Sequence, residues 1–184
     1  MAKTTASSNL GTLRGIHIHY KAVGRSDADA KPDVVHSGYI DGNTGGGNVI
    51  MGGRAFEFYK QELFERTPAT SEVRIPAIRL DDILAPFKSV KLIKIDCEGS
   101  EFPILLTSRL LHRVERIVGE YHEIEAHSMP CLDPGAVVPG FQDYRKEHLA
   151  TVLEQHGFHV TFKESARCLG MFNAIRTRAI RAEV

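Results

Sequence analysis

The stretch Val90 to Glu101, which reads VKLIKIDCEGSE, decides the fold that this sequence predicts. Leu92, Ile93 and Ile95 form an apolar run with few polar interruptions, which is typical of a strand buried on both faces of a parallel sheet. Three acids follow within six residues, and Gly99 supplies a turn among them. Ligands bind outside the carboxyl ends of strands in open α/β sheets, so these acids mark a candidate site. They are Asp96, Glu98 and Glu101.

The residues after these acids predict a helix and then a second strand. We expect the helix over residues 102–111, where Pro103 is tolerated because it falls in the first turn. The next strand lies within residues 113–121, and it leads to Glu120 and His122. Because strand residues two apart share a face, Glu120 and His122 are expected to project together, as are the acids at 96 and 98.

If these two strands are neighbours, the four polar side chains converge at one edge of the sheet. A histidine beside carboxylates can act as a general base near neutral pH, which suits His122 with Glu120 and Glu98. Simpler readings stay open. Asp96 would then cap the helix, Glu98 and Glu101 would be solvated acids of its first turn, and His122 would be an exposed loop residue.

Three blocks of the sequence together resemble the FkbM-type methyltransferase family. They are Arg79–Leu84 (RLDDIL), Leu92–Glu101 (LIKIDCEGSE) and Val118–His122 (VGEYH). Members of this family are similar to class I, S-adenosylmethionine-dependent O-methyltransferases. The resemblance covers Ile16 to Arg176 and implies a Rossmann-like, mainly parallel α/β sheet with strand order 3-2-1-4-5-7-6. Strands 3 to 7 are recognisable, with strand 3 expected at residues 15–24. Strands 1 and 2, which carry the glycine-rich donor loop, are not recognisable, because only about fifteen residues precede strand 3.

The resemblance also implies a cofactor and a substrate class. Asp96 matches the part of the family that lies near the methionine end of S-adenosylmethionine. The end of strand 3 matches the part that approaches the adenine, namely Ala22, Val23, Gly24 and Ser26. The implied acceptor is a hydroxyl on a sugar or small metabolite. Since the donor loop is not recognisable, we expect these 184 residues alone to bind the donor weakly or not at all. An upstream segment, a partner or a second copy would complete the sheet, or strand 3 would move beside strand 4.

Two other functions remain open at this stage. A non-catalytic remnant or interaction module would explain the missing donor loop. A metal-assisted hydrolase would use the acidic cluster, whose side chains are acceptable ligand types, although no spacing motif supports a metal site.

Composition favours a single ordinary soluble domain, residues 1–184, with a frayed start before residue 16 and a tail from residue 177. The hydrophobic fraction is 42% and the charged fraction 25%, and 23 basic residues balance 23 acidic ones, so no basic excess indicates nucleic acid. No apolar run approaches the roughly 20 residues of a membrane span. The start, MAKTTASSNL, lacks the apolar segment expected of a signal peptide. Three distant cysteines suggest neither a disulfide framework nor a zinc site. We therefore expect a reduced, cytoplasmic protein.

The remaining segments have clear local patterns. Residues 25–54 read as a loop, and their glycine-dense part, residues 41–48, fits neither G-x-G-x-x-G nor the P-loop. The other expectations are a helix over residues 55–65, an edge strand or extended lead-in over 73–79, a short helix opened by Asp81 and Asp82, a long loop over 123–143, a helix over 145–156, and strands over 158–163 and 170–176.

Overall fold

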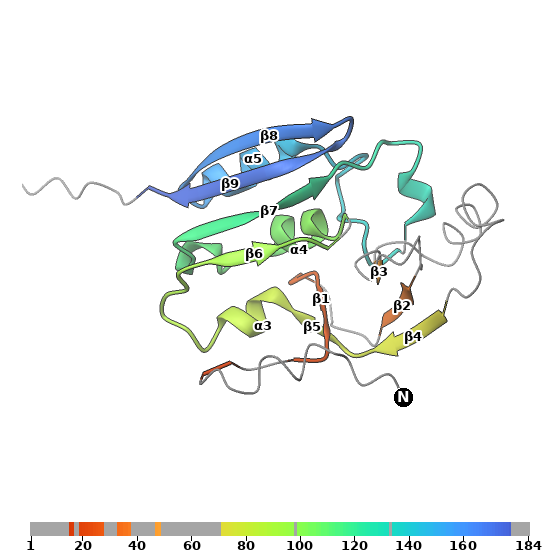
Figure 1. Cartoon of the computed structure of the whole chain (residues 1–184), viewed down its shortest axis with the longest axis horizontal. Helices are drawn as coiled ribbons and strands as arrows, with labels where there is room; N and C mark the ends of the chain where they lie inside the picture. Colours follow the sequence, from red (N-terminus) through yellow and green to blue (C-terminus); the bar gives the residue numbers. More distant parts are fainter. Residues whose placement is uncertain are drawn as a thin grey trace, which may run out of the picture.

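The computed structural model describes residues 15–16, 19–27, 33–37, 47–48, 71–97, 99–132 and 134–177. The helix expected over residues 55–65, most of the N-terminal end, Glu98 and the tail after Thr177 lie outside these described residues. The main body is a four-stranded sheet in the order β6-β7-β9-β8, with two helices, α4 and α5, on one of its faces (Figure 1).

The four-stranded sheet is mixed, which corrects the expectation of a mainly parallel one. Its strands are β6 (Ile93–Ile95), β7 (Arg116–His122), β8 (Phe158–Ala166) and β9 (Leu169–Arg176). The first two are parallel, whereas β9 runs antiparallel to both β7 and β8. The spatial order nevertheless confirms the expected succession of strands 4, 5, 7 and 6.

Strand β6 is not the strand buried on both faces that its apolar run predicts. Within the described residues it pairs only with β7, and Leu92 just before it is 52% exposed. Ile93 and Ile95 are half-buried, and Lys94 between them is exposed. A strand with a neighbour on one side only leaves much of its apolar surface to water.

The segment expected as strand 3 does not fill that edge. Strand β1 covers only Ala22–Gly24 and pairs in parallel with β5 (Ala77–Arg79), so in the described structure it does not stand beside β6. The expected alternative in which strand 3 moves next to strand 4 is therefore wrong for these residues.

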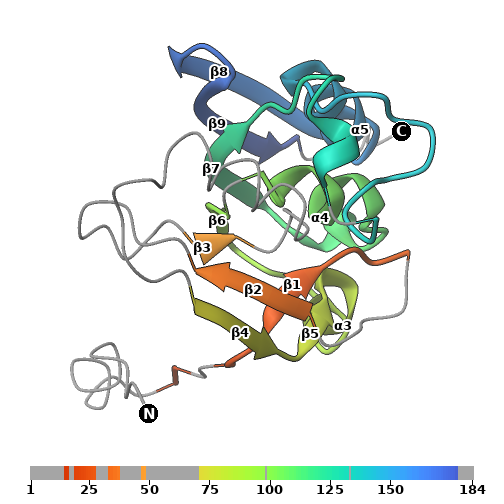
Figure 2. The same ribbon diagram turned by 90° about the vertical axis from the view of Figure 1, so that its right-hand side faces the viewer.

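A separate antiparallel sheet interrupts the region expected to be a loop. Strand β2 (Asp33–Ser37) pairs with β3 (Gly47–Asn48) and with β4 (Ser71–Ile75). Figure 2 shows these three strands together, apart from the four-stranded sheet. Pro76 separates β4 from β5, which confirms an extended segment there.

The helices largely follow their sequence signals. Helix α3 (Leu80–Leu84) begins beside the two aspartates as expected. Helix α5 (Lys146–Gln155) differs from the expectation by one residue at each end, and Gly157 after it has a φ of 84°, as a helix-terminating glycine should. Short 3-10 turns at Leu111–Arg113 and Met129–Cys131 complete the order.

Helix α4 (Glu101–Thr107) ends four residues earlier than expected, because the chain becomes extended at Ser108. The carboxylate of Asp81 accepts the Ser108 hydroxyl at 2.6 Å and the Arg109 N–H at 3.1 Å. These bonds tie the end of α4 to the start of α3 and offer the chain partners outside the helix.

The core lies between the sheet and helices α4 and α5. Phe102 of α4 stacks on Tyr144 with ring centroids 5.3 Å apart, and both side chains are 0% exposed. The Tyr144 hydroxyl donates to the Ala136 carbonyl and accepts the Val138 N–H, so it fastens the long loop after β7 to the core. Burial raises the pKa of Tyr144. This loop and the turn after β6 both lie at the carboxyl edge of the sheet.

Candidate functional site

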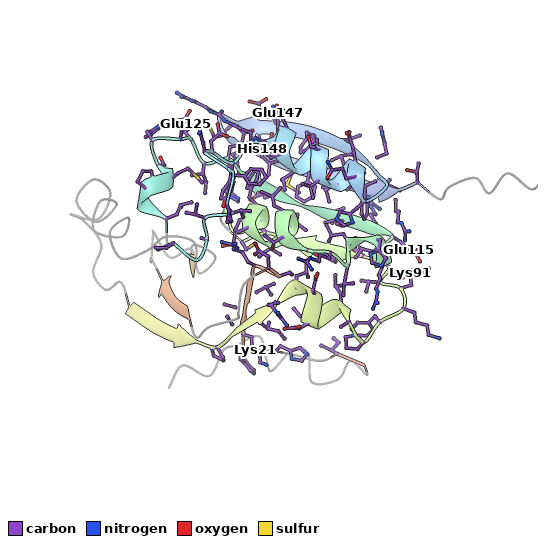
Figure 3. The ribbon with its side chains drawn as sticks, turned by 180° about the vertical axis from the view of Figure 1, so that it is seen from behind. Lys21, Lys91, Glu115, Glu125, Glu147 and His148 are labelled. Atoms are coloured by element: carbon purple, nitrogen blue, oxygen red, sulfur yellow. The ribbon has the colours of Figure 1, made fainter. Side chains whose placement is uncertain are left out.

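The carboxyl ends of β6 and β7 meet at one edge of the sheet, as the sequence predicts for neighbouring parallel strands. Lys94 pairs in register with Val118, which places Asp96 and Glu120 at the next position that faces the same side. Figure 3 shows Glu115, just before β7, and Glu125, beyond its end, at opposite ends of the sheet.

His122 ends β7 and stands between two carboxylates. Its Nε2 lies 3.7 Å from Glu120 Oε2, and its Nδ1 lies 3.5 Å from Glu101 Oε1. The His122 side chain is 22% exposed, so the alternative of an exposed loop histidine is wrong. The strand alternates strictly: Ile117, Gly119 and Tyr121 are buried against the core, whereas Glu120 and His122 share the other face.

The placement of Glu101 differs from what its position in the sequence suggested. Its side chain is 0% exposed, which overturns the reading of a solvated first-turn acid. Its Oε1 accepts the Cys97 N–H at 2.6 Å and its Oε2 accepts the Gly99 N–H at 2.8 Å. The turn after β6 is thus fastened by Glu101 rather than capped by Asp96. A signal was present, because an acid in the first helical turn commonly reaches back to preceding amides.

Asp96 remains partly open to solvent. Its side chain is 42% exposed, and the Lys94 ammonium lies 3.7 Å from its Oδ2. Glu98, the third expected catalytic residue, lies outside the described residues. Within the described part of the chain, no group of three or more histidine, cysteine, aspartate or glutamate side chains could hold a metal ion.

The end of β1 is built into the fold. The Ser26 N–H donates to Thr107 Oγ1 at 2.8 Å, and the Ser26 hydroxyl accepts the Asp81 N–H at 3.1 Å. Ala22, Val23 and Gly24 are half-buried. Among the described residues, no atom lies within 4 Å of a β-carbon placed on Gly24.

Arg25 connects this segment to the loop after β7, although nothing in the local sequence indicates it. Its guanidinium donates two hydrogen bonds to Asp27, at 2.7 and 2.8 Å, and others to the carbonyls of Val137 and Gly135. The hydrogen bonds between them raise the pKa of Arg25 and lower that of Asp27. The two carbonyl partners, at Gly135 and Val137, are 110 and 112 residues away, so no periodicity in the sequence could have indicated these contacts.

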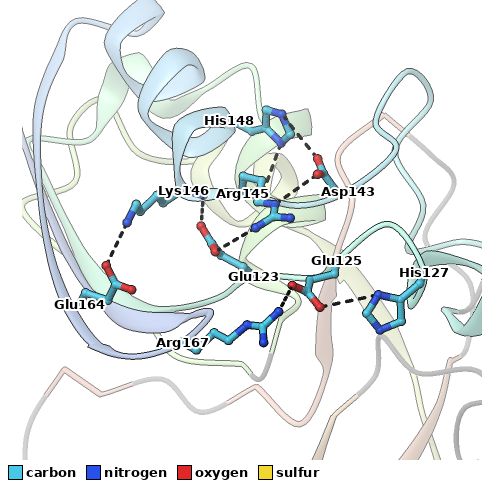
Figure 4. Close-up of polar contacts among 9 residues, drawn as sticks. All are labelled: Glu123, Glu125, His127, Asp143, Arg145, Lys146, His148, Glu164 and Arg167. Carbon is cyan, nitrogen blue, oxygen red and sulfur yellow. Dashed lines mark hydrogen bonds and ion pairs between the residues drawn. The ribbon is translucent and has the colours of Figure 1, made fainter.

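A network of ion pairs lies around the loop that follows β7 (Figure 4). It joins the loop after β7 and the start of α5 to the β8–β9 hairpin. The pairs are Arg167 with Glu125 at 2.9 Å, Lys146 with Glu164 at 3.2 Å, Arg145 with Asp143 at 3.2 Å, and Arg145 with Glu123 at 3.7 Å. Every basic side chain of this group therefore has an acidic neighbour.

Residues 22–176 match the Methyltransferase FkbM domain. The chain belongs to this family. No curated protein and no solved structure matches the chain significantly. Membership confirms the resemblance carried by the sequence blocks, and it implies a Rossmann-like methyltransferase fold and use of S-adenosylmethionine. Among the residues described, none of the helices combines the length and apolar character that crossing a bilayer needs.

The residues of this FkbM domain fit the expected donor in part. Asp96 offers a half-exposed carboxylate, which suits the cationic methionine end of S-adenosylmethionine. Ser26 fits less well, because its N–H and one hydroxyl lone pair already serve the fold. The binding roles of Ala22, Val23, Gly24, Ser26 and Asp96 stay predictions, as do the catalytic roles of Glu98, Glu120 and His122.

Proposed function

We propose that this FkbM domain serves S-adenosylmethionine-dependent O-methylation of a hydroxyl group on a sugar or small metabolite. The observation that carries the proposal is His122, held at the end of β7 between Glu120 and Glu101. The half-exposed Asp96 follows β6, the strand that pairs in parallel with β7. A mostly covered imidazole next to carboxylates is the arrangement expected of a general base.

In this reaction the side chains need only accept one proton and stabilise the resulting positive charge. The donor supplies a methyl group on a positively charged sulfur. His122 accepts the hydroxyl proton of the acceptor at Nε2 while the acceptor oxygen forms its bond to the methyl carbon. The carbon–sulfur bond breaks and its electron pair stays on sulfur, so charge and atoms balance. Glu120 stabilises the imidazolium that results.

The charges at this edge favour a neutral acceptor over an anionic one. Asp96 and Glu120 both face it, and each is about two-fifths exposed. The nearby cations Arg145, Lys146 and Arg167 are already paired with acids. An anionic acceptor would meet like charges without a spare cation among these side chains, whereas a polyhydroxyl compound would meet hydrogen-bond acceptors.

The test is transfer of a labelled methyl group to a panel of sugars and hydroxylated metabolites. The donor is supplied at millimolar concentration because we expect weak binding by the 184 residues alone. His122→Gln should lower the transfer rate by about 10²-fold or more, as expected for loss of a general base. The matched control is His159→Gln, which changes an exposed histidine of β8 and should leave the rate unaltered. Equal rates for His122→Gln and the unaltered chain would refute His122 as the base.

Calorimetric titration with S-adenosylmethionine separates transferase from interaction module. Weak binding that accompanies transfer supports the proposal. A low-micromolar dissociation constant for these residues alone would contradict the expected weak binding. No binding at millimolar donor, together with no transfer, would favour the non-catalytic reading.

A further inference from the structure

The side chain of Glu101 is 0% exposed. A buried carboxylate must be held by hydrogen bonds, because an ionised group is very unfavourable away from water. Both of its oxygens accept backbone N–H groups, from Cys97 and Gly99, at 2.6 and 2.8 Å. These bonds explain why the carboxylate tolerates burial. They also fix its position relative to the end of β6.

The same carboxylate faces the imidazole of His122 on the next strand. Glu101 Oε1 lies 3.5 Å from His122 Nδ1, while Glu120 Oε2 lies 3.7 Å from Nε2 on the other side of the ring. The two carboxylates are not equivalent. Glu120 is 39% exposed and shares its charge with water, whereas Glu101 is buried, so its interaction with the ring is less screened.

A carboxylate accepts hydrogen bonds and donates none, so the buried one favours a proton on the ring nitrogen that it faces. That nitrogen is Nδ1. With Nδ1 protonated, a neutral imidazole keeps the lone pair on Nε2, which lies toward Glu120 on the solvent-facing side of the edge. A second carboxylate that fixes the tautomer and orientation of a histidine is a recurrent way to prepare it for proton transfer.

We propose that Glu101 is a positioning residue for His122: it holds the ring in the tautomer with Nδ1 protonated and Nε2 able to accept a proton. Hydrogen bonds from the turn after β6 fix the position of Glu101, so one buried carboxylate both stabilises this turn and orients the His122 ring. The use of the ring in methyl transfer rests on the proposed function. The tautomer itself does not, because it follows from the positions of Glu101, Glu120 and His122 alone.

The experiment is nitrogen NMR of the full chain labelled at histidine, with the His122 signals assigned by their loss in His122→Gln. In the unaltered chain at a pH where the ring is neutral, the form with Nδ1 protonated should exceed the other by about tenfold or more. Glu101→Gln should reduce that ratio severalfold. Glu120→Gln should leave it in favour of Nδ1. The matched control is Glu147→Gln, an exposed first-turn acid of α5, which should change nothing.

Glu101→Gln replaces one acceptor oxygen with an amide donor facing a backbone N–H, so this variant can lose its fold. In that case the His122 tautomer measured in the unaltered chain and in Glu120→Gln tests the proposal. A dominant form with Nε2 protonated in the unaltered chain would overturn the proposal, and so would a tautomer set by Glu120. A chain with the expected tautomer but no methyl transfer would refute the proposed function and leave Glu101 as the residue that positions the ring.

Discussion

Gly119 lies where β7 passes β6, and its replacement by alanine tests the packing that brings the two strand ends together. A β-carbon at this position would stand 2.2 Å from the Ile95 carbonyl oxygen, 2.7 Å from Ile95 Cγ2 and 3.0 Å from Phe172 Cε1. The first distance is about 1.2 Å short of the 3.4 Å at which ordinary contact begins. Because the nearest atom belongs to the backbone, rotation of a side chain cannot relieve the collision.

The free energy change has two opposing parts. Alanine in place of glycine within a strand gains about 0.5–1 kcal/mol from the unfolded state. Overpacking a core costs about 1–3 kcal/mol, and a backbone collision belongs at the upper end or beyond. We therefore expect Gly119→Ala to lower the free energy of unfolding by about 2–3 kcal/mol. For a domain of this size the melting temperature should fall by about 5–10 °C.

Thermal and urea unfolding followed by circular dichroism measure this change. Gly24→Ala is the matched control, since its β-carbon would meet nothing within 4 Å, and its stability should be equal or slightly higher. Adding Ile95→Ala to Gly119→Ala should not restore stability, because the carbonyl oxygen remains in place. A Gly119→Ala protein as stable as the unaltered chain would refute the close approach of β6 and β7.

Two further changes test other contacts. Asp81→Asn should lower the free energy of unfolding by about 1–3 kcal/mol, because one oxygen that accepts from Ser108 or the following amides becomes a donor; Asp82→Asn, on the surface, should change the melting temperature little. Burial, and to a lesser extent the nearby His112, lowers the pKa of His156 below its ordinary value of 6.5. The unfolded chain therefore binds the proton more readily, so stability should fall as the pH drops below about 6.5. The slope of melting temperature against pH should flatten in His156→Asn, and an unchanged slope would contradict this assignment.

The sequence anticipated much of the site because its signals are local. The alternation of β7 required Glu120 and His122 to share a face, and the structure confirms that they do. The turn at Gly99, with its φ of 98°, and the tolerated Pro103 followed equally from single residues. The first-turn position of Glu101 indicated that its carboxylate could reach back to preceding amides, but it did not reveal the burial of the side chain, because a first-turn acid has the same neighbours in the chain whether it is solvated or buried.

By itself, the amino-acid sequence determined the family, the order of most elements and the pair of strands that carry the candidate site. Those properties depend on periodicity, turns and motifs that act over a few residues. Only the tertiary structure showed that β6 is half-exposed in the described chain. It also showed that Ser26 forms hydrogen bonds with α3 and α4, and that Arg25 donates to a carbonyl of the loop after β7. Burial and long-range hydrogen bonds depend on which segments meet in space, and no local sequence pattern indicates that residues 25 and 137 are in contact.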